Sequence, residues 1–292
     1  GSRTGGPLRS SGFARGRRLP AALGIFLFAL VSLFAFLYTL PKETVLSPLR
    51  SALADRGLEF GCEETGFVFP LGLRCGNAVI SPRGGSPLSL DTVVAAWEWT
   101  GLFQWLPFHL RAVRGPASVD IRTSPMISNP GKVRLRLLRV GSEDLGALFP
   151  TSAGTGFLID SAELQWKRAG NGSISGAGEG SLSWLRFPIP AENSPVTEAE
   201  LRDVRLKFSI REGTLLISSL TGTYEGADVE GTGEISRFLT PSRSAVTFHL
   251  RIRNPMEGRI ATLFNLVAKN AKNATLRING TLQAPAGEFQ FF

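Results

Sequence analysis

Most of this chain alternates between apolar and polar side chains with a period of two, which is typical of β-strands that have one buried and one solvated face. Residues 132–140 are the clearest case, because Val133, Leu135 and Leu137 alternate there mainly with arginines. Comparable stretches recur from residue 58 onward, separated by turns rich in Gly, Pro and Ser. The pattern predicts about a dozen strands, at residues 58–62, 67–80, 88–99, 107–115, 117–123, 132–140, 157–166, 172–184, 198–210, 215–220, 227–235, 245–252 and 274–283.

Two or three short helices interrupt this pattern. Residues 47–56 have apolar positions on one helical face, and residues 142–148 begin with Ser142 as the N-cap. A third helix is predicted from Asn254, an N-cap followed by Pro255, to about Lys269. The expected fold is therefore mainly β: a long, curved antiparallel sheet with an apolar concave face and a few short helices.

Residues 19–40 depart from the alternation, because all 22 of them are uncharged. As a helix they would extend roughly 33 Å, enough to cross the hydrocarbon core of a bilayer. A buried helix of this length without charge is unusual, and a cleaved signal peptide would have a shorter apolar core. We therefore predict a single N-terminal transmembrane helix at residues 19–40.

Five arginines and no acidic residue precede this segment. The positive-inside rule places residues 1–18 in the cytoplasm as a basic tail and residues 41–292 across the membrane as a β-rich domain. The residues expected to set this orientation are those nearest the segment, Arg15, Arg17 and Arg18. A run containing three prolines suggests a subdomain joint near residues 185–197.

The net charge of +8 is mostly a property of that tail. Without its five arginines, 27 basic residues face 24 acidic ones, which is an ordinary surface balance. The charge therefore gives no reason to expect a nucleic-acid partner.

The chain has two cysteines, Cys62 and Cys75, both on the predicted exported side. In an oxidising compartment they could form a disulfide between neighbouring strands, and the alternative is two buried free thiols. With only two histidines at distant positions, they lack the spacing of a zinc site.

No motif of catalysis or cofactor binding stands out. The glycines near residues 176–180 and 226–233 lie within strand-like alternation and lack the Lys-Ser/Thr of a phosphate loop. We predict no catalytic, cofactor-binding or metal-binding residues, and no enzymatic activity.

Three glycine-spaced patterns carry a resemblance to a known family: residues 53–60 with 69–73, residues 220–235, and residues 276–285. Together they resemble the type II secretion system protein N family, which is similar to the wider AsmA-like group. The resemblance implies a bacterial inner-membrane protein with a β-rich periplasmic domain, and it brings no catalytic residues.

Two functions follow from this resemblance. The first is a non-catalytic structural or assembly role in type II protein secretion, with other secretion proteins as partners. The second is lipid binding or transfer between the inner and outer membranes, with phospholipid as the ligand. An open apolar concave face would favour lipid, whereas a closed and self-packed core would favour a scaffold.

Overall fold

The computed structural model describes residues 58–68, 71–82, 86–97, 108–123, 131–146, 156–168, 174–188, 198–237, 243–254, 271–281 and 285–292, with scattered positions in 28–57 and 261–266. The chain divides into two units, residues 1–52 and residues 53–292. The second unit holds all the strands that the structure describes, and it is described here by itself.

Fourteen strands and one short helix have defined bounds. The elements are β1 (Leu58–Val68), β2 (Leu71–Pro82), β3 (Leu88–Trp97), β4 (Phe108–Arg114), β5 (Ala117–Thr123), β6 (Lys132–Gly141), α3 (Ser142–Gly146), β7 (Gly156–Arg168), β8 (Ile174–Pro188), β9 (Glu198–Arg211), β10 (Thr214–Tyr224), β11 (Ala227–Ser236), β12 (Ala245–Arg253), β13 (Asn273–Gly280) and β14 (Pro285–Phe291).

The strands form one antiparallel sheet whose spatial order is the order of the sequence, from β1 to β14. Each strand pairs with the strand before it and the strand after it, and β1 and β14 are the two edges. The prediction of a mainly β chain with one long antiparallel sheet is confirmed. Among the described residues the sheet is not closed, since its two edge strands do not pair with each other.

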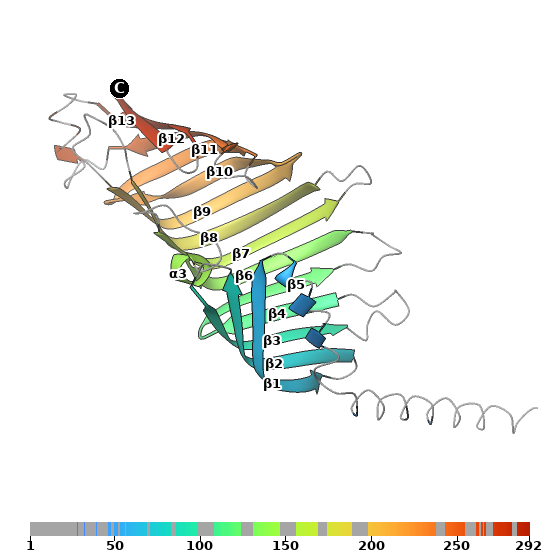
Figure 1. Ribbon diagram of the computed structural model, residues 1–292. Helices are drawn as coiled ribbons and strands as arrows, with labels where there is room; N and C mark the ends of the chain where they lie inside the picture. Colours follow the sequence, from blue (N-terminus) through green and yellow to red (C-terminus); the bar gives the residue numbers. More distant parts are fainter. Residues whose placement is uncertain are drawn as a thin grey trace, which may run out of the picture. The chain divides into compact units, whose positions relative to one another are not determined.

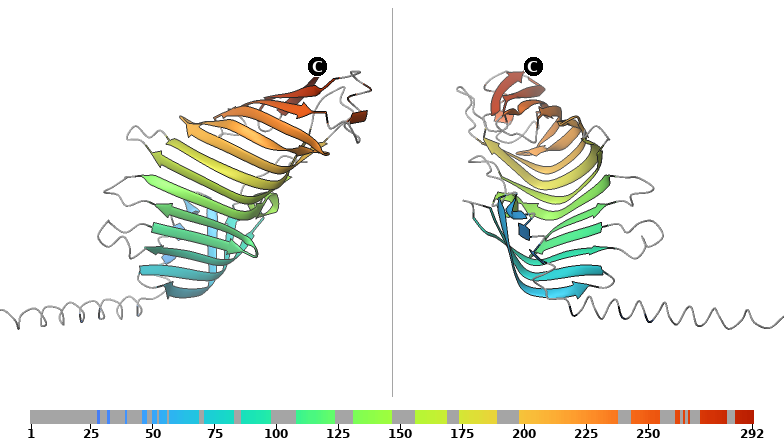
Figure 2. Two further views of the ribbon diagram at one scale, coloured as in Figure 1. Left: turned by 180° about the vertical axis from the view of Figure 1, so that it is seen from behind. Right: turned by 45° about the vertical axis from the view of Figure 1, so that its right-hand side comes forward.

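The sheet is strongly bent and twisted (Figures 1 and 2). Side chains converge on the concave side of a bent sheet and spread apart on the convex side, so small residues are needed where the concave side is crowded. A Cβ built on Gly178 would lie 2.5 Å from the Phe208 ring, and one on Gly233 would lie 2.4 Å from the Phe248 ring. The face that carries these two rings is the crowded one, and it is apolar.

The C-terminal part of this face is a closed core. Its buried members come from β8 to β13 and from the segment between β12 and β13, which supplies Phe264 and Ala271. The helical positions Ala261, Thr262, Phe264 and Leu266 lie in the predicted third helix. Phe264 is buried there, and Leu266 is 76 % exposed.

The structure differs from the predicted elements at several strands. Phe67 and Val68 belong to β1 and not to the second strand, and β10 continues past Leu220 to Tyr224. We expected 274–283 to be the last strand, which is wrong: β13 ends at Gly280, and β14 follows. We also ended the strand of residues 172–184 too early, because β8 continues to Pro188. Proline is tolerated at the first or last position of a strand, where no ladder hydrogen bond is lost. Pro188 is the last residue of β8, and Pro285 is the first residue of β14.

The predicted transmembrane segment and the tail before it lie outside the described residues, apart from Phe28, Ser32 and Thr39, which are helical and exposed. Arg15, Arg17 and Arg18 also lie outside them. In the part of the chain that the structure describes, no helix is long and apolar enough to cross a membrane. Residues 189–197, in the predicted joint, are likewise not described.

Candidate functional site

One apolar row crosses the sheet from edge to edge. In an antiparallel sheet, residues directly opposite one another on neighbouring strands point to the same face. Following these pairs from β1 to β14 gives fourteen residues, all apolar or glycine: Phe67, Leu73, Ala95, Leu110, Ile121, Leu135, Leu164, Gly178, Phe208, Ile217, Gly233, Phe248, Ile278 and Gly287.

A second row runs beside the first and has one polar member, Thr65. Its residues are Thr65, Cys75, Val93, Ala112, Val119, Leu137, Ala162, Gly180, Leu206, Leu220, Gly231, Leu250, Leu276 and Phe289. The two rows together make a continuous apolar face that runs perpendicular to the strands. We refer to it as the apolar face, and to the opposite side of the sheet as the polar face.

Apart from Thr65, the side chains of the apolar face are apolar from one edge of the sheet to the other, but the extent of their burial changes along it. In β9 to β13 its members are buried or packed against the core; Leu220, Leu250 and Leu276 are 5 %, 3 % and 2 % exposed. In β4 to β7 none of them is fully buried. We call this second part the open section, consisting of Leu110, Ala112, Val119, Ile121, Leu135, Leu137, Ala162 and Leu164.

Strand β8 separates the closed core from the open section. After Ile174, three successive apolar-face positions of this strand are glycines, at 176, 178 and 180, so the sheet there presents backbone instead of side chains. A Cβ at Gly176 would lie 2.6 Å from the Gln165 carbonyl oxygen, and one at Gly178 would lie 2.5 Å from that of Glu163. Gly176 and Gly178 are therefore required by the close approach of β7.

The polar face is held by salt bridges between neighbouring strands. Arg134 donates two hydrogen bonds to the Glu163 carboxylate, at 2.9 and 2.8 Å. The Arg134 hydrogen bonds, together with one from Gln165, lower the pKa of Glu163, and Glu163 raises the pKa of Arg134. A similar pair joins Arg186 to Glu200 at 2.7 Å and lowers the pKa of Glu200.

His109 also lies on the polar face, where its Nε2 is 2.9 Å from an oxygen of Asp120. Burial raises the pKa of Asp120, but the hydrogen bonds from His109 and Arg122 lower it by more, so the carboxyl titrates below its usual range. This pairing joins β4 to β5 on the polar face.

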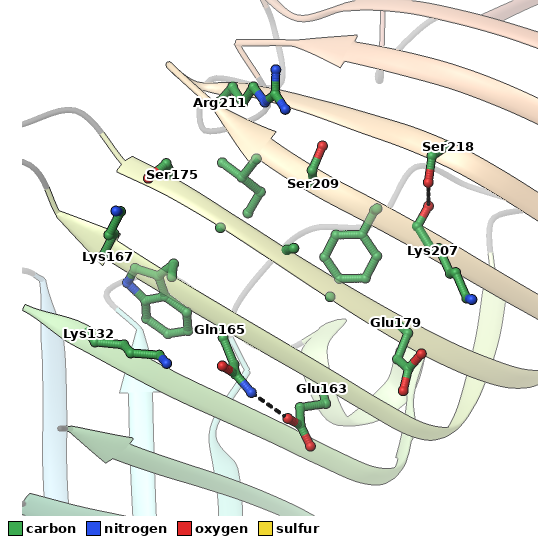
Figure 3. A pocket seen from close by; sticks show the side chains of 16 residues that line it. Lys132, Glu163, Gln165, Lys167, Ser175, Glu179, Lys207, Ser209, Arg211 and Ser218 are labelled. Atoms are coloured by element: carbon green, nitrogen blue, oxygen red, sulfur yellow. Dashed lines mark hydrogen bonds between the residues drawn. The ribbon is translucent and has the colours of Figure 1, made fainter. Parts of the chain in front are cut away.

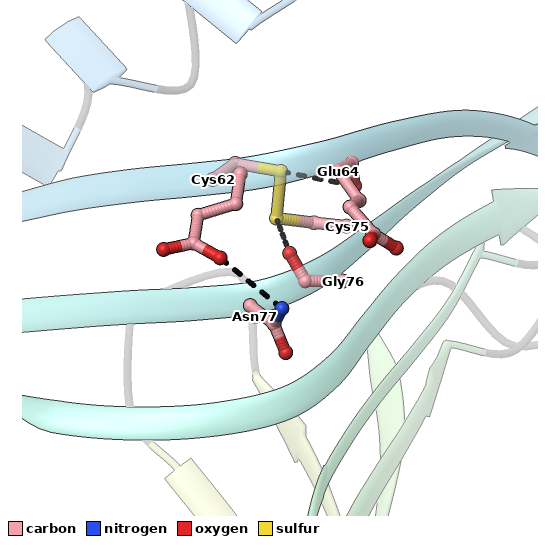
Figure 4. The surroundings of a disulfide bond; sticks show 6 residues. Cys62, Glu64, Cys75, Gly76 and Asn77 are labelled. Carbon is pink, nitrogen blue, oxygen red and sulfur yellow. Dashed lines mark hydrogen bonds between the residues drawn. A yellow bond between two sulfur atoms is a disulfide. The ribbon is translucent and has the colours of Figure 1, made fainter.

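The two cysteines are joined by a disulfide between β1 and β2 (Figure 4). Beside it, the Asn77 side-chain amide donates a hydrogen bond of 3.1 Å to the Glu63 carboxylate. Asn77 has a positive φ of 51°, which asparagine tolerates better than most residues. The disulfide thus lies at the N-terminal edge of the sheet, where β1 has a neighbour on one side only.

Within the described residues, no group of three or more His, Cys, Asp and Glu side chains is arranged to hold a metal ion. The candidate site is therefore the open section of the apolar face. Sequence reasoning anticipated an apolar face but not its two parts, because the register that connects Leu135 to Leu164 and Phe208 is set by pairings between distant strands.

No protein-family model, curated protein or solved structure matches this chain.

Proposed function

We propose that the protein binds the acyl chains of a membrane lipid on the open section, as a membrane-anchored lipid-binding or lipid-transfer protein of the bacterial inner membrane with its sheet in the periplasm. The observation that carries this proposal is the change of burial along one unbroken apolar face. The sequence resemblance to the AsmA-like group agrees with it.

The open section has the chemistry that an acyl chain needs. Along the two rows every strand from β4 to β7 offers only Leu, Ile, Val or Ala, while the charged residues that alternate with them, Arg111, Asp120, Arg134, Arg136 and Glu163, lie on the opposite face. An acyl chain lying along the rows would contact apolar side chains at each strand. Burying a methylene group contributes about 0.8 kcal/mol, so a chain crossing several strands gains several kcal/mol.

The partly exposed apolar side chains of the open section also need an explanation in their own right. Contiguous apolar patches on soluble surfaces usually mark binding sites or a liability to aggregate. An occupant that shields the open section would remove that cost, and a lipid can do so without the polar contacts that a folded partner protein uses.

Site-directed photo-crosslinking tests the proposal directly. Leu137 and Leu138 are neighbours in β6 and are both partly exposed, but Leu137 lies on the apolar face and Leu138 on the polar face. With a photoreactive phenylalanine at each position in cells, we expect lipid adducts on the intact protein from position 137 and several-fold fewer from position 138. Equal yields at the two positions would contradict the proposal.

A second test blocks the open section. Ala162 lies in the second apolar row on β7, whereas Ala245 of β12 is exposed on the polar face. We expect Ala162→Phe to lower the amount of lipid that copurifies with the intact protein in mild detergent, and Ala245→Phe to leave it unchanged. An unrelated single-span membrane protein gives the background.

A structural role in type II secretion is the second candidate. It is supported by the closed core of β8 to β13, which needs no ligand to complete it, and by the sequence resemblance to the protein N family. On this proposal the partners are other secretion proteins, and they should copurify with the intact protein while its lipid content equals that of the control protein.

A further inference from the structure

Three cations form a row on the polar face, at one end of the strands. Lys132 of β6 lies opposite Lys167 of β7, Lys167 lies opposite Ser175 of β8, and Ser175 lies opposite Arg211 of β9. We call these three side chains, Lys132, Lys167 and Arg211, the cation row. Arg211 is the last residue of β9, and a two-residue turn leads from it to β10, so the row runs along a rim of the sheet.

The charges of the cation row are not offset within the described residues, where none of the three forms a salt bridge. Like charges directly opposite each other destabilise a sheet, and Lys132 and Lys167 are such a pair. Two acids, Glu163 and Glu179, lie nearby, and in the described part of the chain neither forms a salt bridge with the cation row. Glu163 binds Arg134, and Glu179 lies opposite Lys207.

The cation row borders a shallow depression of about 930 Å³. Figure 3 shows Lys132, Lys167, Ser175 and Arg211 around it, together with Ser209, which lies on β9 like Arg211. Cationic groups and hydroxyls are the donors that bind phosphate oxygens, and arginine can bind two of them at once.

Each member of the cation row is also adjacent in sequence to a residue of the apolar face. Val133 follows Lys132, Trp166 precedes Lys167, and Ile210 precedes Arg211. The pairs Val133–Trp166, Trp166–Gly176 and Gly176–Ile210 continue the apolar face along the same rim. Apolar surface and unmatched positive charge therefore meet at one rim of the sheet, which is the pattern an anionic amphiphile requires.

We propose that the cation row binds the phosphate of an anionic lipid headgroup, whose acyl chains lie on the apolar face. This inference rests on the proposed lipid-binding function and adds a headgroup class to it: the preferred lipid carries net negative charge. Zwitterionic lipids would bind through the same acyl contacts, but their ammonium group would lie near the cations and oppose binding.

A competition experiment with the intact protein in mild detergent tests this. The protein is incubated with equal amounts of phosphatidylglycerol and phosphatidylcholine that carry identical acyl chains, and the bound lipids are quantified after gel filtration. We expect the wild type to enrich phosphatidylglycerol. The variant Lys132→Gln/Lys167→Gln/Arg211→Gln should keep its total bound lipid and lose that enrichment, by about fivefold for each charge removed.

A matched control removes three cations elsewhere on the polar face. Arg251 and Arg253 of β12 and Arg277 of β13 are exposed, and their replacement by Gln changes the net charge by the same amount. This control should enrich phosphatidylglycerol as the wild type does. An equal loss in the control would show an effect of overall charge and would overturn the assignment.

The remaining outcomes separate the two proposals. Bound lipid with no headgroup preference, or a preference that the cation-row variant retains, overturns the headgroup assignment and leaves the acyl-binding proposal standing. No lipid bound by any of the proteins overturns both. Binding of glycerol 3-phosphate that depends on the cation row, with an unchanged lipid preference, would make the row a site for small anions and would also overturn the assignment.

Discussion

The contact between Gly233 and Phe248 makes a quantitative prediction about the crowded apolar face. A Cβ added at Gly233 would lie 2.4, 2.6 and 2.8 Å from three atoms of the Phe248 ring, and these are its three nearest neighbours. Carbon atoms in contact are ordinarily about 3.5–4.0 Å apart, so the ring would have to move by about 1 Å or more. We expect Gly233→Ala to lower the free energy of unfolding by about 1–3 kcal/mol, the usual cost of overpacking.

The expected loss of stability is informative, because replacing Gly by Ala normally raises the free energy of unfolding. Replacing Gly by Ala at an unstrained position stabilises a protein by about 0.4–1 kcal/mol, since the unfolded chain loses freedom. Gly66 offers the matched control: a Cβ there meets nothing within 4 Å, and its φ is not in the left-handed range. Gly66→Ala should therefore be neutral or slightly stabilising.

The assay is urea unfolding of the intact protein in detergent, followed by tryptophan fluorescence, for both alanine variants and for Gly233→Ala combined with Phe248→Ala. Once the ring is absent, Gly233→Ala should cost nothing, because the ring supplies its nearest contacts. A Gly233→Ala variant as stable as wild type, or a double variant whose cost is the sum of the two single costs, would refute the argument.

Three further predictions concern other parts of the molecule. The disulfide closes a chain segment with a sequence separation of 13, so replacing both cysteines by serine should lower the free energy of unfolding by about 2–3 kcal/mol; an unchanged urea midpoint would contradict this. The lowered pKa of Asp120 means that its carboxylate stabilises the fold above the pKa of the unfolded chain, and that this stability is lost as the pH falls through the folded value. Asp120→Asn should remove that step from a plot of unfolding midpoint against pH, and a step of unchanged size would assign it to another group. Replacing Arg15, Arg17 and Arg18 by glutamate should invert or scramble the predicted topology, and a periplasmic reporter fused after the last residue should then lose activity. A fully active reporter would reject the topology argument.

The elements that could be predicted from sequence are those whose pattern is local. Residues 198–210, 227–235 and 245–252 alternate cleanly, and β9, β11 and β12 match them to within a residue. The last strand was missed because Pro285 and Gly287 look like a chain ending, although Phe289 and Phe291 alternate with Glu288 and Gln290 as strand residues do.

The division of the apolar face could not have been predicted in this way. Leu135 and Leu250 are the same residue type in the same alternating setting, yet Leu250 is 3 % exposed and Leu135 is only partly buried. The difference depends on what packs above each leucine, and Phe264 reaches the core from a segment that alternation does not describe. The cation row was invisible for the same reason: its members are 35 and 44 residues apart, and only the register of the strands brings them together.

The agreement between strand order and sequence order has a mechanical consequence. Because each strand hydrogen-bonds only to its neighbours in the chain, a force applied at the C terminus acts first on the β13–β14 ladder alone. The strands should then detach from the sheet one at a time, starting with β14. A force–extension trace should show a series of small steps and no single large rupture. Contacts between neighbours in sequence also need only short loops to close, so the strands can be added in the order in which the chain emerges.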